Sequence, residues 1–154
     1  MTAAADVETR ARLSLGTSSD AIHELVAGLL AARPAGGTLL DVGCGSGTLW
    51  TRLRGPFAAC IGLDAVRYDG LPHDVDFRKA DLDSGLPVVD GAADVATAVE
   101  VIEHLENPRA FVRELARAVR PGGWIVVTTP NQLSLLSLLT LATKGTFSAF
   151  QDGD

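Results

Sequence analysis

The sequence predicts an α/β fold in which a mainly parallel sheet lies between two layers of helices. Short apolar runs alternate with stretches in which apolar residues recur at helical spacing. The apolar runs are nearly continuous, as in strands that are buried on both faces. One run leads directly into the glycine-rich turn Gly43–Gly47, after which a new helical pattern begins. These three observations together favour a Rossmann-like three-layer sandwich.

The length and composition favour one domain that binds a small molecule. The 154 residues have the size of a single domain, with 47% hydrophobic and 21% charged residues. We expect its core in residues 20–131, followed by a C-terminal helix and tail in residues 132–154. The formal net charge of -6 disfavours nonspecific binding to nucleic acid or an anionic membrane, because both need a positive surface.

The first half of the chain is expected to contain two core helices and three strands. A helix begins near Asp20, with its N-cap in residues 18–20 and its stop at residues 34–37. Its predicted apolar stripe is Ile22, Leu25, Val26, Leu29 and Leu30. A short helix over residues 48–53 follows the glycine turn. We expect the strands at residues 39–42, 58–64 and 76–82, and a loose helix over residues 6–15.

The second half is expected to add two strands and two helices. A strand over residues 93–99 precedes a helix with Asn107 as N-cap and Pro108 at its first position. Its predicted buried stripe is Phe111, Val112, Leu115, Ala116 and Val119. The sequence Arg120-Pro121-Gly122-Gly123 is expected to stop this helix before a fifth strand over residues 124–129. A last helix is predicted from about residue 132 to residue 144.

The expected topology puts the candidate ligand residues at one edge of the sheet. Right-handed crossovers between parallel strands give the strand order 3-2-1-4-5. The order reverses between the first and fourth strands, and ligands bind outside the carboxyl ends of strands at such a point. The glycine turn, Asp64, Asp81 and Glu100 all follow strands at this edge.

The glycine turn is expected to bind a nucleotide-like ligand. Alternate glycines let the backbone approach a ligand closely and permit positive φ. The spacing G-x-G-x-G departs from the dinucleotide fingerprint, which needs Gly or Ala at position 48, where this chain has Thr48. A Walker loop is excluded, because no Gly-Lys-Ser/Thr follows. A purely structural role of these glycines is the alternative.

Three aspartates near the strand ends are candidate ligand residues. Asp64 could accept hydrogen bonds from the cis-diol of a ribose, and a strand-end cap is its alternative. Asp81 could accept from an adenine amino group, although neighbouring Asp83 makes a turn cap nearly as good an explanation. Asp41 is expected within a buried strand, where a carboxylate must be paired or hydrogen-bonded. It could orient the loop amides or bind an ammonium group.

These motifs together resemble those of class I S-adenosylmethionine-dependent methyltransferases. The resemblance rests on LLDVGCGSG at residues 39–47, Asp64, ADL at residues 80–82, EVIEHL at residues 100–105 and LARAVRPGGWIVVTTPN at residues 115–131. It implies S-adenosylmethionine as cofactor, S-adenosylhomocysteine as product, and transfer of a methyl group to oxygen, nitrogen or carbon of a small molecule. A nicotinamide-dependent oxidoreductase is the rival that the loop spacing disfavours.

The resemblance assigns roles to individual residues of this chain. It implies that the turn from Gly43 through Cys44 and Gly45 to Gly47 passes close to the cofactor, and that Asp41 supports its methionyl amine. Asp64 would bind the ribose hydroxyls. Asp81 would bind the adenine amino group, with the Leu82 backbone at the ring edge. Glu100 would border both the methyl donor and the acceptor.

The segment Glu100-Val101-Ile102-Glu103-His104 leaves three interpretations open. It resembles the metal-binding segment of ubiquinone-biosynthesis O-methyltransferases and of small-RNA 2'-O-methyltransferases, so a divalent cation is one. Glu100 or His104 as general base is the second, and a structural or substrate-orienting role is the third. Metal is not favoured, because the other histidines, His23 and His73, form no second histidine-rich segment.

The chain departs from the family at its C-terminal end. Members normally continue into two further strands, and neither is found after residue 131. Either the sequence is a fragment of a longer protein, or the fifth strand would present an unpaired edge that the last helix or a partner, such as a second copy of the chain, could cover. Acceptor-binding residues would be lost and turnover impaired, so a non-catalytic cofactor-binding or interaction module is the alternative function. We expect a cytoplasmic protein with no integral membrane segment, because residues 1–14 lack an apolar signal core.

Overall fold

A computed structural model describes residue 8 and residues 18–131, 133–134, 138 and 141–143. Its core elements, in chain order, are α2 (Asp20–Ala31), β1 (Thr38–Val42), α3 (Thr48–Leu53), β2 (Ala59–Asp64), β3 (Val75–Lys79), β4 (Ala93–Val99), the 3-10 turn η1 (Ile102–His104), α4 (Pro108–Ala118) and β5 (Val119–Thr128). The predicted helices over residues 6–15 and 132–144 fall largely outside the described residues.

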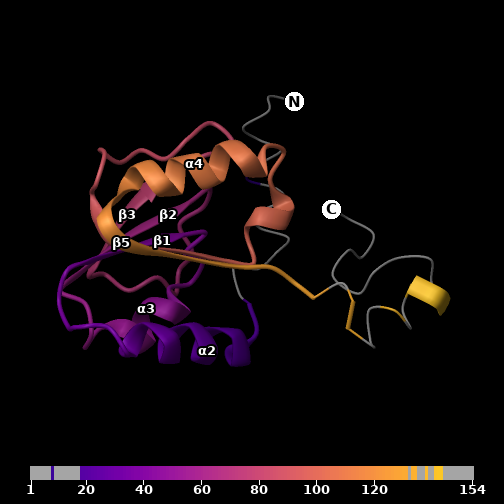
Figure 1. The fold of residues 1–154 in the computed structure, drawn as a ribbon, viewed down its shortest axis with the longest axis horizontal. Helices are drawn as coiled ribbons and strands as arrows, with labels where there is room; N and C mark the ends of the chain where they lie inside the picture. Colours follow the sequence, from indigo (N-terminus) through magenta and orange to yellow (C-terminus); the bar gives the residue numbers. More distant parts are fainter. Residues whose placement is uncertain (1–7, 9–17, 132, 135–137, 139–140, 144–154) are drawn as a thin grey trace.

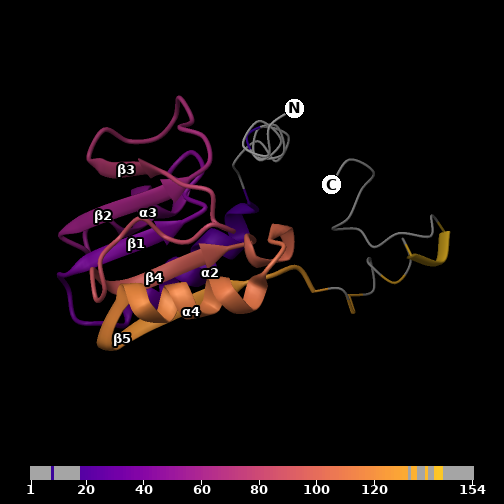
Figure 2. The same ribbon diagram turned by 90° about the horizontal axis from the view of Figure 1, so that it is seen from above.

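The described strands form a five-stranded, fully parallel sheet in the order β3-β2-β1-β4-β5. Helices α2 and α3 cover one face of the sheet, and α4 covers the other (Figure 1). The predicted α/β class, layering and strand order are therefore confirmed. The arrowheads of the strands point to one edge, which we call the carboxyl edge (Figure 2).

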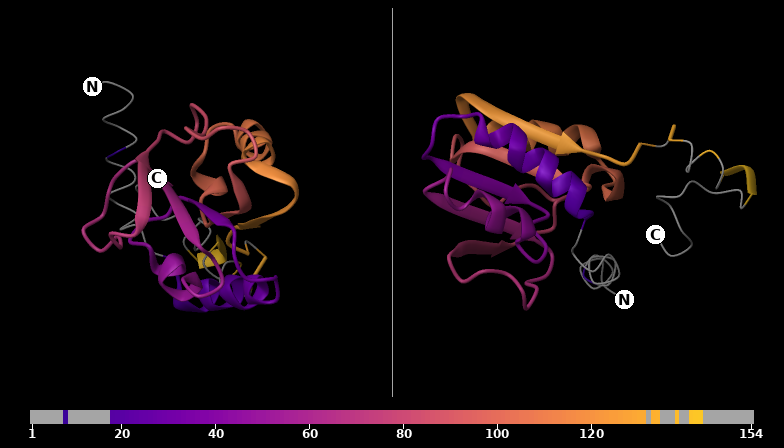
Figure 3. Two further views of the ribbon diagram at one scale, coloured as in Figure 1. Left: turned by 90° about the vertical axis from the view of Figure 1, so that its left-hand side faces the viewer. Right: turned by 90° about the horizontal axis from the view of Figure 1, so that it is seen from below.

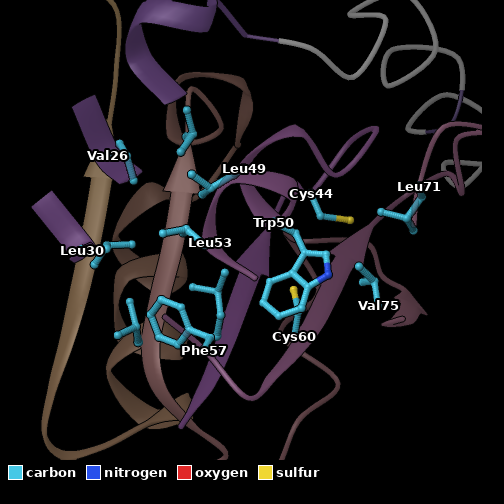
Figure 4. Close-up of a cluster of buried hydrophobic side chains, with 13 residues drawn as sticks. Val26, Leu30, Cys44, Leu49, Trp50, Leu53, Phe57, Cys60, Leu71 and Val75 are labelled. Atoms are coloured by element: carbon cyan, nitrogen blue, oxygen red, sulfur yellow. The ribbon is translucent and has the colours of Figure 1, made fainter. Parts of the chain in front are cut away.

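Each face of the sheet has its own buried apolar cluster. On the face of α2 and α3, Val26 and Leu30 pack with Trp50, Leu53 and neighbouring side chains (Figure 4). On the other face, the buried side of α4 packs against inward-facing residues of β1 and β4. Burial on both faces explains the continuous apolar runs of the central strands.

Helix α4 begins as the sequence predicts. The Asn107 side chain accepts a hydrogen bond from the Ala110 amide at 3.0 Å, and Pro108 occupies the first position. This cap satisfies one of the amide groups that a helix leaves unpaired at its amino end.

Two predicted helix stripes are partly wrong. On α2, Leu25 is 68% exposed, and Leu29 is also exposed, whereas His23, Val26 and Leu30 are buried. Successive helical residues are rotated by about 100°, so Leu25 and Leu29, one residue before the buried pair, point away from the sheet. For the same reason Val112 and Ala116 of α4 are exposed beside buried Phe111 and Leu115.

Two predicted strand bounds are also wrong. The third strand ends at Lys79 rather than at residue 82, because a turn closes there with the Ser84 amide donating to the Asp81 carbonyl. The fifth strand begins at Val119, and Pro121-Gly122-Gly123 forms an irregularity within it instead of a preceding stop. At Gly123 a Cβ atom would lie 2.6 Å from the Asp94 carbonyl oxygen, so only glycine fits this close strand approach.

Candidate functional site

The glycine turn joins β1 to α3 at the carboxyl edge. Gly43, Gly45 and Gly47 have φ angles of 73°, 49° and 77°, in the left-handed region that favours glycine. A Cβ atom on Gly47 would lie 2.5 Å from Cδ of Pro72, and one on Gly43 would lie 2.3 Å from Cγ2 of Val101. The turn therefore depends on glycine both for its backbone angles and for the space around it.

The end of β2 holds the glycine turn in place. The amides of Gly43 and Cys44 donate to the Leu63 carbonyl at 2.7 and 3.1 Å, and the Gly45 amide donates to Oδ2 of Asp64 at 2.9 Å. The Cys44 side chain belongs to the buried cluster in Figure 4, and burial raises the pKa of its thiol. Any contact of Cys44 with a ligand would thus come from its backbone.

Asp64 is a buried carboxylate at the end of β2. Its Oδ1 accepts from the Val66 amide at 3.4 Å, and its Oδ2 accepts from the glycine turn. Burial raises the pKa of Asp64, while the hydrogen bonds from Gly45 and Val66 lower it. Each carboxylate oxygen can accept more than one hydrogen bond, so Asp64 can fix the turn and still bind ligand hydroxyls.

Asp41 lies in β1 directly before the turn and is almost fully buried. The Thr97 hydroxyl of β4 donates to its Oδ1 at 2.8 Å. Burial raises the pKa of Asp41 to about 6; the bond from Thr97 lowers it, and the charge of Asp64 raises it. A nearby cation would favour the ionised form of this buried carboxylate, so Asp41 is suited to bind a positively charged group.

Glu100 directly follows β4 and has a strained backbone. Its φ is 53°, and among the described residues it is the one non-glycine with positive φ. The Glu100 amide donates to the carbonyl oxygen and to Oγ1 of Thr128, at 3.2 and 3.1 Å. Such strain persists only where surrounding contacts enforce it, and it is common at ligand sites.

Glu103 and His104 follow in η1. Oε1 of Glu103 lies 4.0 Å from Nε2 of His104, whose side chain is partly exposed. Oε2 of Glu103 is buried and has no hydrogen-bond partner within the part of the chain that the structure describes. Burial raises the pKa of Glu103, and the Glu100 charge adds to this, while His104 and Thr129 lower it.

Asp81 lies in the exposed turn after β3, directly after Ala80, whose amide donates to the Asp64 carbonyl at 2.9 Å. Its Oδ1 accepts from the Asp83 amide at 3.2 Å, and its Oδ2 accepts from the Ser84 hydroxyl at 2.8 Å. Asp81 therefore caps this turn, and any contact of its carboxylate with a ligand would come in addition to these two hydrogen bonds. Leu82 beside it is partly buried against the cluster under α4.

The structure thus gathers the glycine turn, Asp41, Asp64, Glu100 and Glu103 at the carboxyl edge, and leaves Asp81 at its margin. Within the described ranges, no three His, Cys, Asp or Glu side chains gather closely enough to hold a metal ion. The amino end of α2, with buried His23 in its first turn, also lies at this edge (Figure 3). No motif marks a single histidine on a helix, so only the topology reveals it.

Comparison with known proteins identifies the family. Residues 15–151 match the family model described as "Methyltransferase domain". The chain belongs to the S-adenosylmethionine-dependent methyltransferases. Among the described helices of this methyltransferase chain, none has the length and apolar character needed to cross a bilayer.

Two curated relatives show how much of the family the chain represents. A "Probable S-adenosylmethionine-dependent methyltransferase" of Mycolicibacterium smegmatis is 38% identical over 121 residues, covering 73% of this chain and 45% of that protein. The ubiquinone biosynthesis O-methyltransferase of Thiobacillus denitrificans is 33% identical over 116 residues, covering 70% and 50%. The chain therefore spans about half the length of the curated relatives it matches.

Solved structures agree with the fold. An S-adenosylmethionine-dependent methyltransferase from Mesorhizobium loti has a TM-score of 0.62 at 22% identity, covering 76% of this chain and 57% of that one. The [4+2]-cyclase SpnF has a TM-score of 0.59 at 29% identity, covering 73% and 48%.

Proposed function

We propose that the chain binds S-adenosylmethionine and transfers its methyl group to oxygen, nitrogen or carbon of a small-molecule acceptor. One observation carries the proposal: the Asp64 carboxylate accepts from the Gly45 amide, so that the acidic strand end and the glycine turn form one unit at the carboxyl edge. The turn lies where the strand order reverses between β1 and β4, the place where parallel sheets bind ligands.

The residues at this edge fit the cofactor. Asp41 would hold the methionyl amine, Asp64 the ribose hydroxyls, and Asp81 with the Leu82 backbone the adenine. The positive φ of the turn glycines lets the backbone approach a ligand, and Oε2 of Glu103 needs a polar partner. When bound, the cofactor supplies a methyl group on a sulfonium, the electrophile of the reaction.

The protein's own task is to position the acceptor and to take its proton where the nucleophile is weak. Glu100 and His104 are the residues that we propose for this task. Glu100 directly follows β4 at the carboxyl edge, and the partly exposed His104 imidazole is open to an acceptor. The free thiols of Cys44 and Cys60 suit the reducing cytoplasm, where we propose that the protein acts.

Calorimetric titration with S-adenosylhomocysteine tests cofactor binding directly. We expect the wild-type protein to bind it, and Asp64→Ala to weaken binding at least about tenfold, as for a lost hydrogen bond to a charged group. Asp76→Ala is the matched control, because this exposed aspartate pairs with Arg78 near the start of β3. A folded wild-type protein that binds NADH and not S-adenosylhomocysteine would overturn the proposal.

A second candidate is a non-catalytic module that binds the cofactor or a partner. The exposed apolar side chains of β5, Trp124, Ile125 and Val127, favour it, and we propose that a second copy of the chain covers this strand. The related structure titled a [4+2]-cyclase also carries a different named activity on a similar fold. Cofactor binding without methyl transfer to any of a broad acceptor panel would support this candidate.

A further inference from the structure

Thr97 is a buried polar residue to which the proposed function gives no role. It lies in β4, an interior strand of the sheet, and is 0% exposed. A hydroxyl group is costly to bury unless it makes a hydrogen bond, and valine would fill the same space without that cost. The threonine therefore requires an explanation beyond packing.

The partner of Thr97 is Asp41, directly across the parallel pair of β4 and β1. The two residues are paired in the strand register. The Thr97 hydroxyl oxygen lies 2.8 Å from Oδ1 of Asp41, an ordinary distance for an O–H donor, and 3.4 Å from the Leu40 carbonyl oxygen, which is beyond that range. A hydroxyl has one proton to donate, and its bond to a carboxylate is the stronger one, so the proton is donated to Asp41.

The pleat of the sheet explains why Thr97 is the residue that holds Asp41. Alternate side chains of a strand point to opposite faces, and Leu39 of β1 and Val95 of β4 belong to the apolar cluster on the face of α2 and α3. Asp41 and Thr97 follow them by two positions, so both point to this face. On its other side Asp41 is paired with Gly62 of β2, which has no side chain. Of the two residues paired with Asp41, only Thr97 can therefore hold its carboxylate.

The bond from Thr97 leaves the second oxygen of Asp41 for a ligand. Within the part of the chain that the structure describes, Thr97 is the one hydrogen-bond partner of this carboxylate. Oδ2 lacks such a partner, but it is not among the unpartnered polar atoms that are closed off from solvent. Asp41 also lies two residues before Gly43, where the glycine turn begins. The carboxylate is thus fixed through one oxygen, and its other oxygen is open next to the turn.

The ammonium group of the methionyl part needs an acceptor oxygen that is held in one orientation before the cofactor binds. We propose that Thr97 is a positioning residue for the cofactor, whose hydroxyl fixes Oδ1 of Asp41 so that Oδ2 accepts from the methionyl ammonium group. This inference rests on the proposed function and names the residue through which Asp41 recognises the amine.

A binding cycle tests the inference without an acceptor. S-adenosylhomocysteine and its desamino analogue, in which hydrogen replaces the amine, are titrated calorimetrically into the wild-type chain and Thr97→Val. We expect Thr97→Val to weaken S-adenosylhomocysteine binding about tenfold, as for a lost hydrogen bond to a charged group. Its affinity for the desamino analogue should stay within about twofold, because Asp41 has no amine to bind there.

Further variants separate positioning from folding. Thr97→Ser keeps the hydroxyl and should recover most of the affinity, and Thr97→Ala repeats the comparison if Thr97→Val does not fold. In an Asp41→Asn background, Thr97→Val should change the affinity by less than about twofold, because Thr97 acts through Asp41. Thr38→Val is the matched control, since it makes the same substitution at the opposite end of β1.

The pH dependence of binding gives a readout that a packing role would not change. Burial raises the pKa of Asp41 to about 6, and the bond from Thr97 lowers it, so loss of that bond raises the pKa further. Among the described residues, the titratable groups that interact with Asp41 are Asp64, whose charge raises the same pKa, and the thiols of Cys44 and Cys60, which burial keeps neutral by raising their pKa. We expect the affinity loss of Thr97→Val to be about threefold larger at pH 6.5 than at pH 8, as for a pKa that rises by about one unit.

The outcomes distinguish this inference from the proposed function. Equal loss for both ligands would show that Thr97 supports the site as a whole, and no loss for either would show that Asp41 needs no positioning. Each of these results, like a loss that is equal at both pH values, overturns the inference. If the wild-type chain binds S-adenosylhomocysteine and Asp64→Ala weakens binding, the cofactor assignment holds whatever Thr97→Val shows. If the folded wild-type chain binds neither ligand, the proposed function fails, and the role of Thr97 fails with it.

Discussion

Asp41 shows how a residue suited to a ligand can destabilise the free protein. Burial raises its pKa from about 4 to about 6. The unfolded state therefore ionises first as the pH rises, and the free energy of unfolding falls between about pH 4 and pH 6. Two pKa units correspond to roughly 3 kcal/mol for this buried group. The destabilisation is absent below pH 4 and complete above pH 6.

Asp41→Asn should remove this dependence, because the amide does not titrate. As the pH rises from 4 to 7, the free energy of unfolding of the variant should increase relative to that of the wild type by up to about 3 kcal/mol. Urea unfolding of both proteins at the two pH values measures this difference. The same variant should bind S-adenosylhomocysteine more weakly, because an amide offers the amine no charge. A stability difference that is equal at both pH values would contradict the raised pKa.

At the residue scale, the sequence predicts what is encoded locally and misses what the topology assembles. The turn glycines and Asp64 belong to one contiguous pattern, and the structure joins them by the bond from the Gly45 amide. His23 lies in a helix with no motif around it, and its burial follows from how α2 packs on the sheet. A residue of this kind becomes visible only when the strand order is known.

At the element scale, the caps of α2 and α4 give a matched pair. The Asn107 side chain accepts a hydrogen bond from the Ala110 amide, whereas Ser19, the N-cap of α2, makes no side-chain cap bond. We expect Asn107→Ala to lower the free energy of unfolding by about 1 kcal/mol, measured by urea denaturation. Ser19→Ala should change it by less than about 0.5 kcal/mol. Equal effects of the two substitutions would contradict the role of the cap.

The elements differ in how well local sequence determines their bounds. Helix α4 begins as predicted because Asn107 and Pro108 are local start signals. The predicted end of α4 and the predicted start of β5 are wrong, because the sequence Pro121-Gly122-Gly123 is typical of a turn. The pairing of Val119 with Ala93 extends β5 across that segment instead. Pairing with β4 sets the start of β5, and the local sequence pattern gives no information about that pairing.

At the scale of the whole molecule, the strand order followed from general rules. Right-handed crossovers and continuous apolar runs leave few arrangements for five alternating strands. The site at the β1–β4 reversal follows from this order rather than from any single motif. The acceptor does not follow from it, since the chain spans about half of its curated relatives.

The outer edge of β5 gives the prediction that concerns assembly. Among the described strands, none pairs with that edge, and Trp124, Ile125 and Val127 are 41, 40 and 37% exposed. Unpaired backbone beside apolar side chains favours pairing with another chain. We expect sedimentation velocity to show self-association that increases with protein concentration.

Ile125→Lys should reduce this association, because a lysine on an edge strand opposes pairing through its charge and hydration. Val89→Lys is the control, since Val89 is 76% exposed but lies in the loop before β4. Equal effects of the two lysines would assign the association to general surface hydrophobicity. A wild-type protein that stays monomeric at every concentration would instead show that β5 needs no second copy, and that its apolar side chains are left for a different partner or for solvent.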